Sequence, residues 1–141
     1  MENIKLNYLH LCDAASVDAL GKINILGIFT KLFLTTVPSK FLKFTAVGNI
    51  SFKNVSESQI KIEIKIFDPK KNEIEIKPAI VLTISIPDTN RGKEGDINII
   101  LDLGNIEFKV FGKHNLSVYV NGKVIDSKSF IVEERKGGEK V

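Results

Sequence analysis

The stretch from Gln59 to Phe67 constrains the fold more than any other part of the sequence, because isoleucine occupies every second position. On a β-strand, alternate side chains share one face, so the isoleucines would lie together, opposite the intervening lysines and glutamate. On a helix, they would be scattered around the cylinder. The stretch therefore predicts a strand with one buried and one solvated face, the pattern of an antiparallel sheet. The isoleucines are Ile60, Ile62, Ile64 and Ile66.

Similar alternation recurs along the chain, interrupted by turn signals. Asn121-Gly122 is the strongest of these, because both positions of a two-residue hairpin turn favour positive φ. No stretch has a sustained helical period with caps. The sequence therefore predicts an all-β protein, a single antiparallel β-sandwich, immunoglobulin-like or similar, of roughly seven to nine strands. Expected strands include residues 4–12, 23–30, 44–53, 97–103, 105–111, 116–120, 123–127 and 128–132, with a polar connection over 13–22 and a surface loop over 87–96.

The composition is that of a folded domain. The chain has 141 residues, of which 43% are hydrophobic and 26% charged, enough for one core and too few for two ordinary domains. We expect one sandwich domain over residues 1–132 and a flexible charged tail over 133–141, where the sequence reads EERKGGEKV.

Charge and cysteine content exclude several classes of function. Lys and Arg number 20 against 17 Asp and Glu, without the dense basic stripe of a nucleic-acid-binding protein. The single cysteine, Cys12, rules out an intramolecular disulfide and a cysteine-based zinc site. No signal peptide is visible and no apolar run approaches the ~18 residues of a membrane span. We expect a cytoplasmic protein that binds neither nucleic acid nor membrane.

Catalytic residue types are few. Strict alternation over residues 4–12 would place His10 and Cys12 on one strand face with Ile4, Leu6 and Tyr8. A nucleophilic thiolate also needs a nearby cation or helix N-terminus, and the neighbouring sequence supplies neither. We therefore expect Cys12 to be a buried structural residue and His10 a partly buried, hydrogen-bonded one.

The other candidate catalytic groups do not indicate an active site either. His114 is expected on a surface turn spanning residues 112–115. No glycine-rich phosphate loop is present, because GKEG at residues 92–95 has the wrong spacing. The sequence predicts no catalytic residues, no cofactor and no enzymatic activity.

Asp13 and Asp18 are the only candidates for a metal site. Together with Asp68, Asp88 or the 87–96 loop, they could present oxygen ligands for calcium at one end of a sandwich. The Asp-x-Asp spacing typical of such sites is missing, and both residues serve equally well in satisfying local backbone groups. We expect no metal site, and keep a small-ligand or calcium-binding sandwich as the alternative function.

The preferred hypothesis is a non-enzymatic interaction or structural module that binds an unknown protein partner. Phe33 and Phe41 flank Pro38 and are expected to contribute to an exposed apolar patch. Edge strands could also pair between copies, giving a homo-oligomer.

Six residues near the N-terminus carry a family resemblance. Cys12, Asp13, Asp18, Gly21, Lys22 and Gly27 form the pattern Cys-Asp-x4-Asp-x2-Gly-Lys-x4-Gly. It resembles the signature of a family of small uncharacterised bacterial proteins, a domain of unknown function. Near the C-terminus, Gly112, the Asn121-Gly122 turn and Phe130-Ile131-Val132 resemble the family's Gly-x-Tyr strand, Asp-Gly turn and closing Phe-x-Val. His114 stands in place of the tyrosine and Asn121 in place of the aspartate. The resemblance implies an immunoglobulin-like or similar sandwich and no activity.

Overall fold

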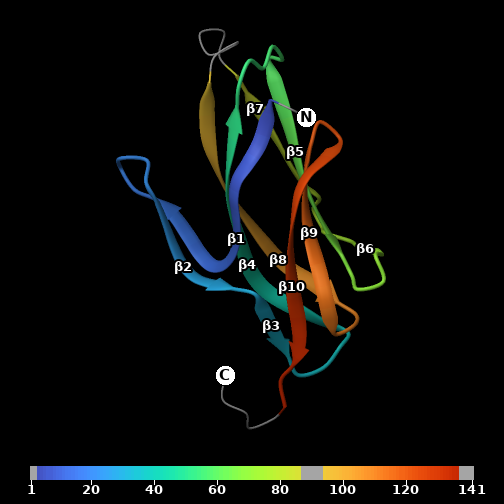
Figure 1. The fold of residues 1–141 in the computed structure, drawn as a ribbon. Coiled ribbons are helices and arrows are strands. Elements are labelled where there is room, and N and C mark those ends of the chain that lie inside the picture. The colour runs from blue at the N-terminus through green and yellow to red at the C-terminus, as the bar shows by residue number, and fades with distance from the viewer. Residues whose placement is uncertain (1–2, 87–93, 137–141) are drawn as a thin grey trace.

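The protein is described here by a computed structural model that covers residues 3–86 and 94–136. Within these residues the chain forms ten β-strands and no helix (Figure 1). No helix there is long and apolar enough to cross a membrane. The strands are β1 (Ile4–Val17), β2 (Ile23–Phe29), β3 (Lys31–Leu34), β4 (Ser39–Phe52), β5 (Gln59–Phe67), β6 (Glu73–Ile74), β7 (Ile80–Ser85), β8 (Gly95–Phe108), β9 (Gly112–Val120) and β10 (Lys123–Glu134).

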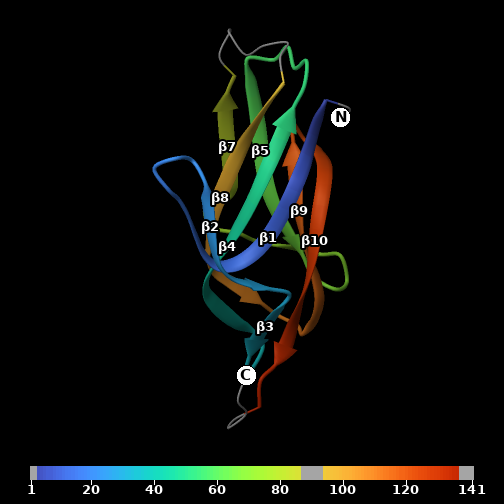
Figure 2. The same cartoon turned by 60° about the vertical axis from the view of Figure 1, so that its left-hand side comes forward.

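Two sheets pack face to face (Figures 1 and 2). The four-stranded sheet has the order β2-β1-β4-β8, and the six-stranded sheet has the order β3-β10-β9-β5-β6 with β7 also paired with β5. All pairings are antiparallel except that of β3 with β10, which is parallel. The predicted all-β sandwich is confirmed, but the described residues form ten strands, including a two-residue β6, where seven to nine were expected, and one pair is parallel.

The core lies between the sheets and is built as the isoleucine pattern predicts. The four isoleucines of β5 are at most 5% exposed. Phe44 from the four-stranded sheet and Phe130 from the six-stranded sheet meet at 6.1 Å between ring centroids. Phe108 of the four-stranded sheet also meets Phe130, at 6.0 Å. Burying each such side chain stabilises the fold by about 1.5–3 kcal/mol, so these aromatic contacts help to hold the two sheets together.

The prediction that side chains alternate strictly along the first strand is wrong. The register between β1 and β4 shifts between Leu6 and Tyr8, so that one extra residue is inserted in β1. Such a bulge reverses the side-chain direction beyond it. Leu9 and Leu11 therefore face the core, whereas His10 and Cys12 point away from it with Tyr8.

Several strands begin or end at other residues than expected, because sheet pairing continues past the local turn signals in the sequence. β1 runs on to Val17, into the expected polar connection. Residues 97–103 and 105–111 belong largely to one strand, β8, and residues 123–132 to β10, which continues to Glu134, two residues into the expected tail. Of the expected 87–96 loop, residues 87–93 lie outside the described residues and Gly95 already belongs to β8.

Candidate functional site

The outer face of the four-stranded sheet points away from the six-stranded sheet. On it, polar and aromatic side chains from three strands, β1, β4 and β8, lie side by side. The residues of β4 at its centre each have one partner on β1 and one on β8. The three rows are Cys12–Thr45–Asp102, His10–Val47–Ile100 and Tyr8–Asn49–Asn98.

The centre of this outer face is buried although no third layer covers it in the described part of the chain. Thr45, Val47 and Asn49 are 1%, 0% and 6% exposed. None of them belongs to the core cluster between the sheets. The flanking side chains of β1 and β8 must therefore shield Thr45, Val47 and Asn49 from water, so that this face is well packed without a covering layer.

An amide cluster, made of Asn7, Asn49, Asn98 and Asp96, forms the polar end of the face. Asn49 donates from Nδ2 to Asp96 at 2.8 Å and to Asn98 at 2.9 Å, and its Oδ1 accepts a 2.6 Å bond from Asn7. The nearly buried amide of Asn49 is therefore satisfied through groups on β1 and β8. Mutual hydrogen bonds fix the orientation of these side chains, as a preorganised binding surface requires.

Two aromatic rings border the amide cluster. Tyr8 stacks on His10 with 5.6 Å between ring centroids and an interplanar angle of 24°. The Tyr8 hydroxyl donates to Asn98 at 3.3 Å. Both rings are half-buried, so they present flat partly apolar surface beside polar groups.

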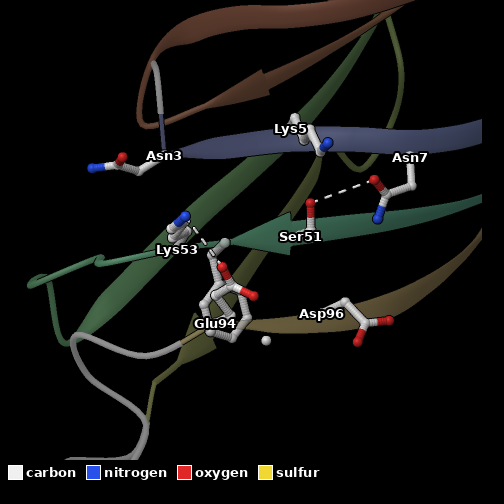
Figure 3. Close-up of a pocket in the computed structure, with 9 residues that line it drawn as sticks. Asn3, Lys5, Asn7, Ser51, Lys53, Glu94 and Asp96 are labelled. Atoms are coloured by element: carbon white, nitrogen blue, oxygen red, sulfur yellow. Dashed lines mark hydrogen bonds and ion pairs between the residues drawn. The ribbon is translucent and has the colours of Figure 1, made fainter.

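A shallow groove of about 700 Å³ lies at the end of the amide cluster (Figure 3). In Figure 3 the side chains of Asn7 and Ser51 point toward each other, and Lys53 points toward Glu94. The Lys53–Glu94 ion pair, at 3.3 Å, offsets charge at one side of the groove. The groove is thus polar without a dominant sign of charge.

The opposite end of the outer face is apolar and is formed by a projecting hairpin. This hairpin, residues 13–29, is called the arm, and it extends from the sandwich at the left of Figure 1. Four of the eight exposed large hydrophobic side chains in the described residues lie on it: Val17 at 52%, Leu20 at 83%, Leu26 at 69% and Ile28 at 56%. Ile28 pairs with Cys12, so the apolar end continues the row that holds Thr45.

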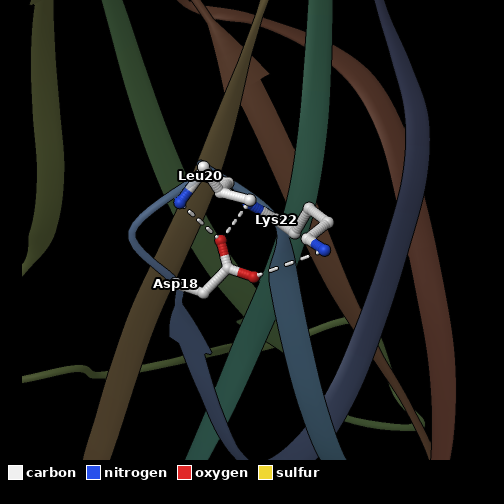
Figure 4. A network of polar contacts seen from close by, with 3 residues as sticks. All are labelled: Asp18, Leu20 and Lys22. Carbon is white, nitrogen blue, oxygen red and sulfur yellow. Dashed lines mark hydrogen bonds and ion pairs between the residues drawn. The ribbon is translucent and has the colours of Figure 1, made fainter.

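Asp18 lies in the turn at the tip of the arm, where its carboxylate holds the turn together (Figure 4). Its Oδ1 accepts hydrogen bonds from the backbone N–H groups of Leu20 at 2.8 Å and Lys22 at 2.9 Å. Its Oδ2 lies 3.9 Å from the Lys22 ammonium group. Asp18 is thus a turn residue, and Gly21 takes the positive φ of 84° that closes this turn.

Asp13 is separated from Asp18 by the last four residues of β1. It lies across from Gly27, where φ is 71°, and its carboxylate occupies the space that a Cβ at position 27 would need. The alternative in which Asp13 and Asp18 share one site is therefore not supported by their positions. In the described ranges, no group of three His, Cys, Asp or Glu side chains could hold a metal ion.

Cys12 is fully buried, as the sequence indicates, and its Sγ lies 3.5 Å from the Thr45 carbonyl oxygen. Burial, reinforced by the Asp13 carboxylate, raises the pKa of the Cys12 thiol. A thiol with a raised pKa is a weaker nucleophile at neutral pH, because less of it is thiolate.

His114 is not on a surface turn, contrary to expectation. β9 already begins at Gly112, and the imidazole is 0% exposed between Phe108 and Phe130. Nδ1 is 2.9 Å from the Gly112 carbonyl oxygen, while Nε2 has no hydrogen-bond partner among the described residues. Burial lowers the pKa of His114, so the neutral ring is favoured.

The expected apolar patch at Phe33 and Phe41 is not formed either. Both side chains are half-buried, and Phe41 packs edge-on against Phe44 with 6.0 Å between centroids. Half of the exposed large hydrophobic side chains of the described residues lie on the arm instead.

A family model described as "Family of unknown function (DUF6941)" matches residues 7–133. The chain belongs to this family. The match fits the expected domain of unknown function, and within it Asp18 and Gly21 close the arm while Asp13 and Gly27 face each other across it. That these residues form the family's signature stays a prediction.

Two solved structures match the chain at low sequence identity. One is an alkylpurine DNA glycosylase from Pseudomonas fluorescens bound to DNA containing an abasic site analog, with 10% identity, a TM-score of 0.50 and 93% of this chain covered. The match covers 30% of the glycosylase chain, so it bears on the fold alone. The other is an immunoglobulin-like protein from Pseudomonas aeruginosa, with 14% identity, a TM-score of 0.41, and 92% and 96% of the two chains covered. No curated protein matches the chain.

Proposed function

We propose that this protein is a non-enzymatic binding module that holds a protein partner on the outer face of its four-stranded sheet. The observation that carries this proposal is the continuity of the face, from exposed Leu26 and Ile28 on the arm to the amide cluster. The buried cores of protein interfaces are depleted in charge and combine apolar with hydrogen-bonding groups. The row of His10, Val47 and Ile100 at the middle of this face has that character.

The partner's chemistry follows from the two ends. Leu26 and Ile28 favour apolar side chains, because covering them removes apolar surface from water. Asn98 and Asp96 favour backbone or amide groups, since an amide and a carboxylate offer both donors and acceptors there. A protein segment supplies both kinds of group along one surface.

The state of the other candidate groups supports a non-enzymatic role. The Cys12 thiol is buried and its pKa is raised, and His10 stacks on Tyr8. The Asp18 carboxylate is engaged by its own turn, which weighs against the calcium alternative. A free buried thiol is compatible with the cytoplasmic location that we propose.

Site-specific photo-cross-linking in the host cell tests this proposal. A photoreactive amino acid replaces Ile100 at the middle of the outer face, and in a matched control it replaces Thr83, an outward residue on β7 of the other sheet. We expect a discrete covalent adduct from position 100 that is absent from position 83 and is lost when Asn98→Lys is added. No adduct at position 100, or the same adduct from both positions, would contradict the proposal.

A further inference from the structure

The free edge of β2 is unprotected against pairing. In the described part of the chain β2 pairs with β1 alone, so its other edge carries unpaired backbone groups. Natural edge strands are commonly protected by charge or proline, and β2 has neither between Ile23 and Phe29. The opposite edge of the same sheet, β8, carries Asp96, Asp102 and Glu107.

The sequence of this edge has the symmetry that a two-fold strand pair requires. Around Gly27, residues 24–30 read polar, apolar, apolar, glycine, apolar, apolar, polar, as Asn-Ile-Leu-Gly-Ile-Phe-Thr. In an isologous contact, residue i of one copy meets residue j of the other and j meets i. A two-fold axis at Gly27 would place Leu26 opposite Ile28, Ile25 opposite Phe29 and Asn24 opposite Thr30.

Other two-fold registers do not match in this way. An axis at Leu26 would place Asn24 opposite Ile28, and an axis at Ile28 would place Leu26 opposite Thr30. Each sets a polar residue against one of the two exposed apolar side chains, which lowers the stability of a cross-strand pair. Only the axis at Gly27 joins the exposed side chains of Leu26 and Ile28.

Gly27 itself suits a position on the axis. It has no side chain to collide with its symmetry mate, and the space where a Cβ would lie is already filled by Asp13 of its own chain. The backbones of two copies can therefore approach to strand spacing.

We propose that a second copy of this chain pairs antiparallel with β2 about a two-fold axis at Gly27, joining the two four-stranded sheets into one. The proposal rests on the proposed function, since both treat the arm as an interaction surface, and it assigns a second copy of the chain to the edge of the arm while the outer face stays open to another protein partner. The outer faces of both copies would then lie on one extended sheet, with the Leu26–Ile28 contacts at its centre.

Sedimentation equilibrium of the purified chain tests the dimer. Protein concentrations from about 1 µM to 1 mM cover the range over which a micromolar dimer dissociates. We expect the mass to rise from one chain to two. Leu26→Glu alone and Ile28→Lys alone should each weaken the dimer at least about tenfold, because each buries a charge opposite an apolar residue.

The register is tested by combining the two changes. With the axis at Gly27, the double variant Leu26→Glu/Ile28→Lys sets a carboxylate opposite an ammonium group twice per dimer, so it should recover most of the lost affinity. Val124→Glu, at a 56% exposed position on β10, is the matched control and should leave the dimer intact. Circular dichroism melting confirms that the variants stay folded.

A monomer at every concentration, or a dimer indifferent to both single changes, would overturn the inference, and a double variant without recovery would overturn its register. Its failure is distinguishable from failure of the proposed function. An adduct at position 100 with a monomeric mass in solution leaves the protein-binding face standing and removes only the second copy. A dimer without that adduct does the reverse.

Discussion

The outer faces of the two sheets differ in chemistry although both are built from alternating strands. On the six-stranded sheet the outward positions of β5 are charged: Lys61 lies 3.6 Å from Glu63, and Lys65 lies over the Tyr119 ring at 5.0 Å. On the four-stranded sheet the matching central positions are Thr45, Val47 and Asn49, which are almost fully buried. The charged side chains of the six-stranded sheet keep its outer face in contact with water. The polar groups on the outer face of the four-stranded sheet form hydrogen bonds with one another instead. The difference teaches that outward-facing does not mean water-facing in this protein.

The largest expected contrast comes from removing one buried polar side chain from each face. Asn49→Ala deletes three short hydrogen bonds and should lower the free energy of unfolding by about 2–3 kcal/mol. Ser117, 7% exposed on the other sheet, makes one 3.4 Å hydrogen bond to Ser127, and Ser117→Ala should cost about 0.5 kcal/mol or less. Urea unfolding of both variants measures the contrast. Equal losses would mean that the amide cluster has no special role in stability.

The pH dependence of stability should come from the six-stranded side. The pKa of His114 is lowered by burial, so below the ordinary value of 6.5 the unfolded chain binds a proton that the folded chain does not. Stability should therefore be constant above pH 6.5 and fall as the pH drops below it, by at most about 1.4 kcal/mol per pH unit for one proton.

His114→Phe isolates this effect. The replacement keeps an aromatic ring against Phe108 and Phe130 and removes the titrating group and the unpartnered Nε2. In this variant the free energy of unfolding, measured with denaturant between about pH 5 and pH 7, should no longer change with pH across the ordinary histidine pKa of 6.5. A slope that survives the change would assign the proton uptake to a group other than His114.

The strands could be predicted from the sequence because alternation is a local property. Gln59–Phe67 was predicted with its bounds, and the turn role of Asp18 follows from its place before Gly21. The bulge between Leu6 and Tyr8 could not, because one inserted residue leaves no compositional trace while it reverses every later side chain of β1.

The candidate site was missed for a related reason. Asn7, Asn49 and Asn98 are 42 and 49 residues apart along the chain, and only sheet order brings them together. Asn49 looked like any solvated outward residue in its strand. The available signal was that the outward positions around it, Val47 and Thr45, are uncharged, unlike those of β5.

The smallest contrast concerns the two aspartate turns, one belonging to each sheet. Asp68 accepts backbone hydrogen bonds from Lys70 at 2.8 Å and Asn72 at 2.9 Å, the same pattern as Asp18 with Leu20 and Lys22. Position 71 has a φ of 69° on lysine, where the arm has glycine. The hydrogen bonds from the backbone, first that of Asn72, lower the pKa of Asp68.

Asp18→Ala and Asp68→Ala should therefore lower the stability by similar amounts, because in each variant two turn N–H groups bond to water instead of to a carboxylate. The pH effect at Asp68 has the same direction as that at His114 but lies at lower pH: a lowered carboxyl pKa adds stability above the ordinary value of 3.8, and that stability is lost as the pH falls below it. Unfolding of both variants at neutral pH compares the turns, and acid titration shows whether Asp68→Ala flattens the loss of stability below pH 3.8. A much larger loss of stability in Asp18→Ala would mean that the turn at the tip holds the arm in shape. The position of the β2 edge would then depend on this turn.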